Sequence, residues 1–272
     1  MYDNWIFWVV AVFAAITVGL GKGGFPVIAS LAVPSLSLFM SPITAAGLLL
    51  PVYIISDIFA LFFYRKDFDI RVLKISILGM TIGVLIGWAT ANIVIEWVVT
   101  LIIGLMGVIF AINELFKKRI KKTKLIKINH SKGIFWCSIS GFTSFISHNG
   151  GPPWQIFVIP LGLTKVVYVG SSVLAFSYVN AIKVIPYFFL GQLNFASIKI
   201  ALFLIIPASL AVYIGFLAVK FIPERVFYLL VSWALLIISV IELIDGSSKT
   251  FPELISFNSI PSEKHSPFPV II

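Results

Sequence analysis

The sequence has few charged residues: only 11% of its 272 residues are Asp, Glu, Lys or Arg, whereas 60% are hydrophobic. Soluble domains carry about 25% charged residues, so the composition excludes an ordinary soluble globular domain. Uncharged apolar runs of about 20 residues, the length that spans a bilayer as a helix, recur along the chain. We therefore expect an all-α polytopic membrane protein without a separate soluble domain.

Cysteine and the motifs of enzymes are scarce or absent. Cys137 is the single cysteine, so it cannot form an internal disulfide, and its apolar surroundings indicate a core side chain. The chain has no HExxH metal motif, no DDxxD motif, no GxSxG nucleophile turn and no P-loop. We expect no enzymatic activity, no metal and no cofactor.

The formal net charge of +9 is concentrated at the ends of apolar runs. Basic residues cluster in 65–74 and in 117–132, and Lys and Arg beside membrane spans mark cytoplasmic loops. We expect both loops to be cytoplasmic in a multi-pass protein of the bacterial inner (plasma) membrane. The charge therefore reports topology rather than nucleic-acid binding, although the longer loop could also contact anionic membrane lipids.

The apolar runs divide the chain into two similar halves. Two segments, 5–40 and 133–163, are too long for one simple span and are interrupted by glycine and proline. We predict a first transmembrane repeat over 1–116, a basic loop over 117–132, a second repeat over 133–244 and a flexible tail over 245–272. The remaining segments each fit one span: 43–64, 71–91, 94–115, 166–190, 197–220 and 225–244.

Features of the first half recur in the same order in the second, which indicates an internal duplication. This predicts about eight main transmembrane helices and about 8–10 crossings, with a broken first segment in each repeat. If segment 5–40 crosses the membrane once, the two repeats are parallel. If it crosses the membrane twice, they are inverted. The sequence leaves both alternatives open. The matching pairs are GGFP at 23–26 with GGPP at 150–153, Gly47 with Gly170, Asp57 with Asn180, Gly87 with Gly215, and Glu114 with Glu242.

Two matching breaks at membrane depth favour a transport site. Irregular backbone cannot face lipid, and it persists where it is packed in protein or lines a polar cavity. Paired interruptions in two halves are the best sequence indication of a secondary transporter's site. The alternative is that the glycines only allow close helix packing.

The first break, GLGKGGFP at 19–26, carries the strongest candidate residues for binding an anion. Lys22 supplies positive charge, and we expect Gly23 and Gly24 to present free backbone N–H groups at a helix start, which suits an anion. The alternative is a lysine whose side chain reaches outward to the membrane interface.

The second break places His148, Asn149, Gly150 and Gly151 at the equivalent position. The two side chains can donate hydrogen bonds, and His148 can also titrate near physiological pH. Alternatively, these groups only satisfy the broken backbone. Weaker candidates are Ser144, Ser147, Trp154 and Gln155.

Other ionisable residues within spans are also candidates, because such residues are costly in a membrane. Asp57 could carry a proton or pair with Lys22 or Lys183, and Asn180 and Lys183 share one helix face. By contrast, Glu114 and Glu242 lie at the ends of predicted spans, so we expect them to be solvated caps.

GLGKGGFP, the later stretch FTSFISHNGGPPWQIFVIPLGL and the basic loop between them resemble the TauE/SafE family of membrane permeases, over about residues 5–245. The resemblance implies a secondary transporter of small sulfur anions such as sulfite, sulfoacetate or other sulfonates. It does not name the anion, the direction of transport, the coupling ion or the oligomeric state.

The combined hypothesis is a secondary permease that binds its anion at Lys22, Gly23, Gly24, His148, Asn149, Gly150, Gly151, Asn180 and Lys183. Asp57 and His148 are the candidates for proton coupling. The alternatives are a passive anion channel and a non-transporting membrane scaffold subunit.

Overall fold

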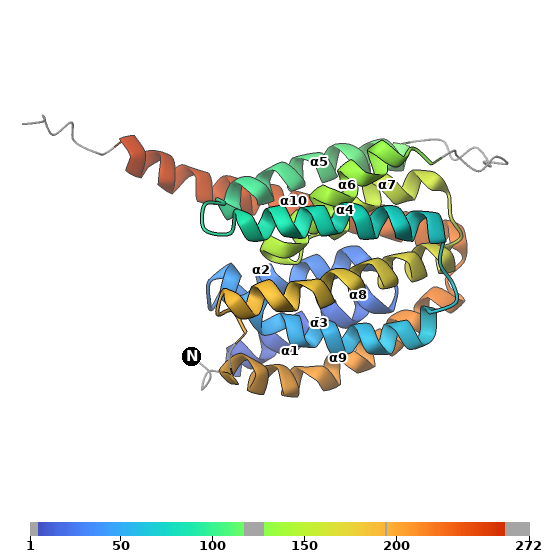
Figure 1. Ribbon diagram of the computed structural model, residues 1–272, viewed down its shortest axis with the longest axis horizontal. Helices are drawn as coiled ribbons and strands as arrows, with labels where there is room; N and C mark the ends of the chain where they lie inside the picture. The colour runs from blue at the N-terminus through green and yellow to red at the C-terminus, as the bar shows by residue number, and fades with distance from the viewer. Residues whose placement is uncertain (1–4, 117–127, 194, 259–272) are drawn as a thin grey trace, which may run out of the picture.

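The computed structural model describes residues 5–116, 128–193 and 195–258, and all regular elements in these ranges are helices (Figure 1). Seven helices are long and apolar enough to cross a membrane, which confirms the prediction of an all-α polytopic membrane protein. The elements are α1 (Trp5–Gly23), η1 (Pro26–Leu31), α2 (Ala32–Leu36), α3 (Pro42–Tyr64), α4 (Ile70–Ala89), α5 (Glu96–Phe116), α6 (His130–Ser147), α7 (Gly151–Val158), η2 (Ile159–Leu161), α8 (Lys165–Phe189), α9 (Phe195–Phe221) and α10 (Glu224–Asn258).

Both glycine-containing segments are broken helices, as the sequence predicts. α1 ends at Gly23, and the backbone N–H groups of Gly24 and Phe25 both donate to the carbonyl of Leu20, at 3.0 and 3.1 Å, which closes its last turn. Pro26 then begins η1, where its missing N–H is not needed. In the second half, α6 ends where His148 adopts a left-handed conformation with φ of 55°.

The two broken segments enter the bundle from opposite ends. α1 begins at the end marked N, and η1 and α2 return toward that end; α6 begins at the opposite end (Figure 1). This corresponds to the alternative in which 5–40 passes through the bundle twice. The duplication itself stays a prediction.

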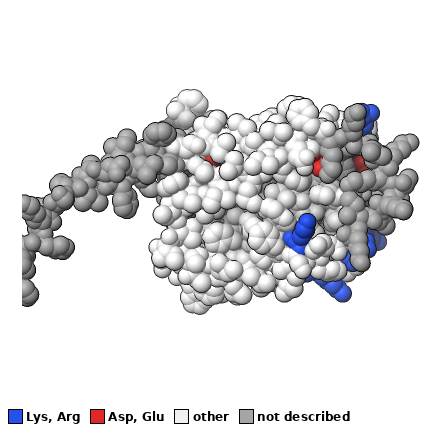
Figure 2. All heavy atoms as spheres, turned by 90° about the horizontal axis from the view of Figure 1, so that it is seen from above, with Lys and Arg blue, Asp and Glu red and all other residues white. Residues whose placement is uncertain are grey.

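The described ends of the basic loops lie together. The α3–α4 connection at 65–69, the end of α5 and the start of α6 are all at the end opposite the N-terminus (Figure 1). Lys and Arg side chains also gather at that end (Figure 2). Their cytoplasmic location stays a prediction, and residues 117–127 of the longer loop lie outside the described residues.

The helices form two groups that meet along the middle of the molecule. α4, α5, α6, α7 and α10 lie above α1, α2, α3, α8 and α9 in the view of Figure 1. Within the lower group α1 and α9 touch through backbone, because a Cβ on Gly23 would overlap the carbonyl oxygen of Val212 and the Cα of Gly215. Because the residues at this contact are small, the backbones of α1 and α9 can lie directly against each other.

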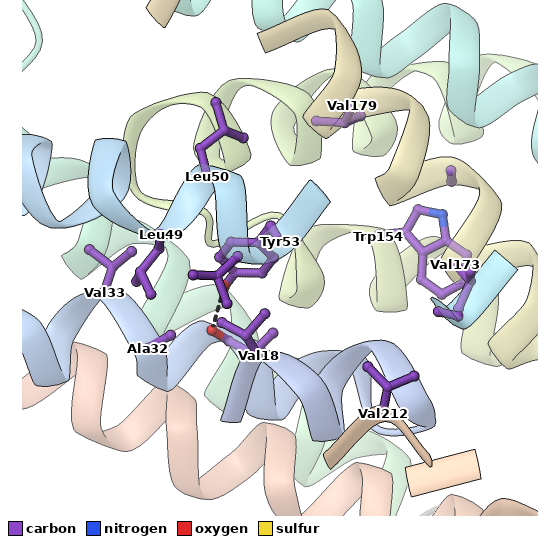
Figure 3. Close-up of a cluster of buried hydrophobic side chains, with 14 of the residues drawn as sticks. Val18, Ala32, Val33, Leu49, Leu50, Tyr53, Trp154, Val173, Val179 and Val212 are labelled. Carbon is purple, nitrogen blue, oxygen red and sulfur yellow. Dashed lines mark hydrogen bonds between the residues drawn. The ribbon is translucent and has the colours of Figure 1, made fainter. Parts of the chain in front are cut away.

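Aliphatic side chains fill the core, together with the aromatic rings of Tyr53 and Trp154 (Figure 3). Tyr53 of α3 is buried, and its hydroxyl donates to the carbonyl of Ala29 in η1 at 2.8 Å. Trp154 of α7 is fully buried and donates from Nε1 to Ser76 Oγ at 3.0 Å. These bonds satisfy polar atoms that would otherwise be costly to bury. Cys137 is buried as well, in keeping with its predicted core position.

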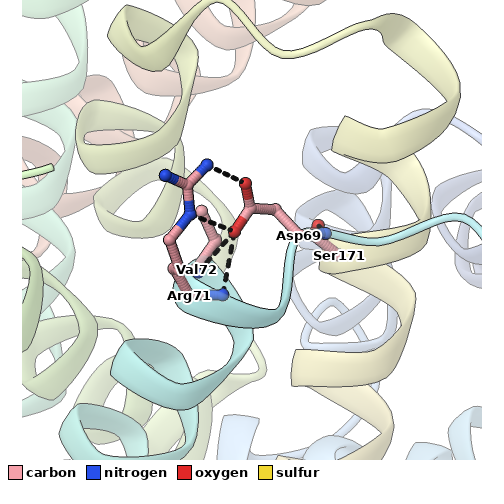
Figure 4. A network of polar contacts seen from close by, with 4 residues as sticks. All are labelled: Asp69, Arg71, Val72 and Ser171. Atoms are coloured by element: carbon pink, nitrogen blue, oxygen red, sulfur yellow. Dashed lines mark hydrogen bonds and ion pairs between the residues drawn. The ribbon is translucent and has the colours of Figure 1, made fainter. Parts of the chain in front are cut away.

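A capped turn sets the start of α4. Asp69 Oδ1 accepts hydrogen bonds from the backbone N–H groups of Arg71 at 2.8 Å and Val72 at 3.2 Å, and its backbone N–H donates to Ser171 Oγ at 2.9 Å (Figure 4). The Arg71 side chain also donates to the carboxylate, and this contact lowers the pKa of Asp69 below its ordinary value. The cap thereby joins α4 to α8.

α10 differs from the predicted end of the second repeat. The sequence predicts a flexible tail from Asp245, but the helix continues to Asn258. The polar composition after Asp245 therefore does not end the helix at that residue. Residues 259–272 lie outside the described residues.

Candidate functional site

A cavity lies where the two groups of helices meet near the broken segments. Its volume is about 30 Å³, more than the ~10–15 Å³ that one buried water molecule needs. Residues from α1, η1, α3, α6, α7 and α8 line it, so both halves contribute. They are Gly21, Lys22, Pro26, Ala29, Tyr53, Ser144, His148, Gly151, Ser172, Val173, Phe176 and Asn180.

One side of the site is a buried ion pair shared by three helices. Lys22 Nζ lies 2.6 Å from Asp57 Oδ1. The other carboxylate oxygen, Asp57 Oδ2, accepts a hydrogen bond from Asn180 Nδ2 at 2.7 Å. Both oxygens of Asp57 are thus engaged, and the positive charge of Lys22 is balanced by its partner. The pairing with Lys22 is one of the two that the sequence left open for Asp57, the other being a pairing with Lys183.

On the other side, Lys183 contacts the lining residues Ser144 and His148 and does not itself line the cavity. Its Nζ approaches the carbonyl of Ser144 at 2.9 Å, Ser144 Oγ at 3.1 Å and His148 Nδ1 at 2.8 Å. His148 Nε2 lies 3.0 Å from the carbonyl of Ala46. A carbonyl only accepts, so Nε2 carries a proton, and Nδ1 accepts from the ammonium of Lys183. This assigns a neutral His148 in the Nε2–H tautomer.

Aromatic rings hold these groups in place. The ring of Tyr53 stacks on His148, with centroids 4.5 Å apart. Lys22 Nζ lies 5.3 Å from the ring centroid of Tyr53 and 5.8 Å from that of Phe176, within the range of a cation–π contact. Sequence reasoning missed both aromatic residues, because in an apolar helix they are indistinguishable from core side chains.

The buried charges do not balance. Lys22 pairs with Asp57, whereas Lys183, which is fully buried, contacts no carboxylate among the described residues. An uncompensated buried charge is costly, and a bound anion would neutralise it. Within the described ranges, no group of three His, Cys, Asp or Glu side chains is arranged to hold a metal ion.

The predicted role of the first glycine motif is wrong in one respect. Lys22 and Gly23 form the last turn of α1 rather than the start of a helix, and the N–H of Gly24 is bonded to Leu20. Gly23 and Gly24 pack on Gly215 and do not line the cavity. The packing interpretation therefore applies to these two glycines. A lysine in the last turn of a helix is favoured by the helix dipole.

The second glycine motif does lie at a helix start. Gly150 is the N-cap of α7 and Gly151 is its first residue, a position whose backbone N–H has no partner within the helix. Gly151 lines the cavity, and Pro152 and Pro153 that follow have no N–H to offer. Gly151 therefore places a backbone N–H without a partner in its own helix at the wall of the cavity.

Asn149 faces away from the cavity toward α10. Its Nδ2 donates to Glu242 Oε1 at 2.5 Å, and Glu242 is buried. The prediction that Glu242 is a solvated cap is wrong, because its side chain is buried and bonded to Asn149. Ser147 lies outside the cavity and donates to the carbonyl of Thr143, and Gln155 is fully buried elsewhere in α7.

Of the comparisons with known proteins, the one with family models gave a match. A search of curated proteins and a search of solved structures each gave no match. A family model described as "Sulfite exporter TauE/SafE" matches residues 6–242, which include both broken segments and every residue that lines the cavity. The chain therefore belongs to the sulfite exporter TauE/SafE family.

Proposed function

We propose that this protein is a secondary permease for small sulfur oxyanions, such as sulfite, sulfoacetate or other sulfonates. The anion binds in the cavity between the two groups of helices. Family membership supports the general class of transporter and of substrate. The individual substrate, the binding residues and the coupling are part of the proposal.

The observation that carries the proposal is that the buried amine of Lys183 has no carboxylate partner among the described residues. Among the described groups at the site, two lysines stand against one carboxylate, and that carboxylate is held by Lys22 and Asn180. Lys183 is satisfied only by neutral acceptors of Ser144 and His148. An entering anion can replace one of these acceptors and gain a charge-assisted hydrogen bond.

The remaining donors suit a compact oxyanion. A sulfite or sulfonate group presents its oxygen acceptors in several directions. Donors that can meet them are the ammonium of Lys183, the backbone N–H of Gly151 and the hydroxyl groups of Ser144 and Ser172, which line or adjoin the cavity. Lys22 acts mainly through Asp57, by holding that carboxylate away from the anion.

Proton coupling is a further part of the proposal. Asp57 and His148 are each bonded to one of the two lysines, so a proton on either group would change the charge that the anion meets. A coupled carrier is distinguished from the passive-channel alternative by a saturable response that a pH gradient alters.

The proposal is tested with the purified protein in proteoliposomes adsorbed to a solid support, by recording currents on rapid addition of an anion. The panel contains sulfite, sulfoacetate, taurine, an aromatic sulfonate, sulfate and acetate, with and without a pH gradient. We expect a saturable current with at least one sulfur anion and none with acetate. Absence of any response or of equilibrium binding across the panel, from protein shown to be folded, would contradict the proposal.

A further inference from the structure

Glu242 and Asn149 form a second buried polar pair, outside the cavity. Glu242 lies in α10 with 3% of its surface exposed, and Asn149 lies in the α6–α7 turn with 5% exposed. Asn149 Nδ2 donates to Glu242 Oε1 at 2.5 Å. The pair therefore joins the second broken segment to the last membrane helix.

Within the part of the chain that the structure describes, each member of the pair has one oxygen without a hydrogen-bond partner. These atoms are Asn149 Oδ1 and Glu242 Oε2, and both are buried. Both are acceptors when the glutamate is ionised, so neither can satisfy the other. Leaving a buried acceptor unpaired costs about 1–3 kcal/mol, and more if it is charged.

Among the described residues, no cation compensates Glu242. Its own helix carries another acid, Asp245, three residues further along the chain. The turn beside it presents the neutral amide of Asn149. An ionised carboxylate buried in this setting would be strongly disfavoured.

Among the described residues, the elements packed against α10 place no basic side chain beside Glu242. The sequence of η1 contains no titratable side chain, and that of α7 contains none either. α5 carries Glu96 in its first turn and Glu114 in its last. α8 meets α10 through Tyr168, whose ring contacts Phe227 and Tyr228.

We infer that Glu242 is a proton-binding residue of this transporter. A proton taken from water adds to Oε2, and the resulting O–H donates to Asn149 Oδ1. Together with the existing bond from Asn149 Nδ2 to Oε1, this closes a cyclic acid–amide pair in which both unpaired oxygens are satisfied. No covalent bond to carbon is made or broken, and release of the proton reverses the step.

The proton would act on the anion site through the α6–α7 turn. Asn149 lies between His148, which bonds Lys183, and Gly150, which caps α7. Hydroxyl groups of Thr143 and Ser140 hold the carbonyls of Asn149 and Gly150, at 2.9 and 2.6 Å. Loss of the proton places two acceptors against each other and favours displacement of this turn. This coupling rests on the proposed anion site; the protonation of Glu242 does not.

Protonation is tested without any anion, by infrared spectroscopy of the reconstituted protein over a range of pH. We expect a carbonyl band of a buried carboxylic acid at neutral pH in the wild type, and its absence in Glu242→Gln. Gln preserves the size of the side chain, an acceptor for Asn149 Nδ2 and a donor for Oδ1, so the fold is expected to survive. If Glu242→Gln does not fold, Asn149→Leu replaces it, with the band expected to move because the acid loses its partner. A spectrum without such a band, or one unchanged in the variant that folds, overturns the inference.

Coupling is tested by the anion current with and without a pH gradient. We expect the gradient to stimulate the wild type, and the ratio of the rates with and without the gradient to be smaller in Glu242→Gln than in the wild type while the anion still binds. Glu114→Gln, the same change near the end of α5, is the matched control and is expected to keep the stimulation. Equal stimulation in Glu242→Gln and the wild type overturns the coupling. A wild type that binds no anion contradicts the proposed function, whereas the infrared result still decides the protonation.

Discussion

Asn180 donates a hydrogen bond to Asp57 at 2.7 Å, and the two residues are 123 positions apart in the chain. They are the residues that the sequence matched between its two halves, and they join α3 to α8. Lys22 from α1 occupies the other oxygen of the carboxylate at 2.6 Å. Three helices are thus tied together by one buried acid, and Lys183 remains as the lysine available to an anion.

Removing one member of the Lys22–Asp57 pair should cost more stability than removing both members together. Lys22→Ala leaves Asp57 buried without its cation, which we expect to lower the free energy of unfolding by about 3–5 kcal/mol. The double variant Lys22→Met/Asp57→Asn removes both charges and should lose much less. Unfolding of the protein in detergent, measured for the two single variants and the double, gives the coupling energy. Additive losses would contradict a direct interaction.

The hydroxyl and the ring of Tyr53 should have separable effects. Tyr53→Phe loses the hydrogen bond to Ala29, which we expect to cost about 0.5–1.5 kcal/mol, while the stacking on His148 remains. Tyr53→Ala also removes a buried ring and should cost about 3–5 kcal/mol. Thermal unfolding measures both. If the two variants lose equal stability, the ring of Tyr53 does not contribute to the packing of the core.

Gly23 and Gly151 should respond differently to alanine. A methyl group at Gly23 meets the backbone of α9, so Gly23→Ala should lose at least about 1–3 kcal/mol of stability through overpacking. At Gly151 a Cβ would be 3.5 Å from the nearest atom, the carbonyl oxygen of Pro26. Gly151→Ala should therefore fold normally but weaken anion binding by narrowing the cavity. Thermal unfolding and anion titration of both variants test this contrast, and a reversed order of stability would contradict it.

The cap at Asp69 should give stability that depends on pH. Asp69→Ala removes an N-cap, a change that costs about 0.5–2 kcal/mol in other helices. Arg71 lowers the pKa of Asp69 in the folded protein, so the stabilisation is present above the ordinary carboxyl pKa and is lost as the pH falls through the lowered value. Thermal unfolding at neutral and acidic pH should show a difference between variant and wild type that shrinks in acid. A difference that grows in acid would contradict the assignment.

Much of the fold could be predicted from the sequence because the bilayer imposes the length of each apolar run. The predicted single spans correspond to α3, α4, α5, α8, α9 and most of α10, and the two breaks occur at the predicted glycines. The end of α10 could not be predicted, since a polar composition indicates exposure to water and does not exclude a helix. The duplication of the two halves also stays a prediction, because the order of the helices alone does not establish it.

The site was predicted less completely, because the type of a residue does not show which way its side chain points or which end of a helix it occupies. The glycines around Lys22 fit the end of a helix as well as the start of one, and only the structure distinguishes them. Glu242 was assigned to solvent from its place near the end of a span, whereas it is buried and bonded to Asn149, far away in the chain. Lys183 was recognised as a candidate, but its contact with His148 depends on the packing of α8 against α6.

The most direct test of the central claim is anion binding by Lys183→Gln, compared with Lys199→Gln on the exposed surface of α9. A hydrogen bond to a charged group contributes about 1.5–3 kcal/mol, so we expect the affinity of Lys183→Gln for the best sulfur anion to fall by about 10–150-fold. Lys199→Gln should bind like the wild type. Full affinity in folded Lys183→Gln would contradict the assignment of the buried lysine as the anion's partner.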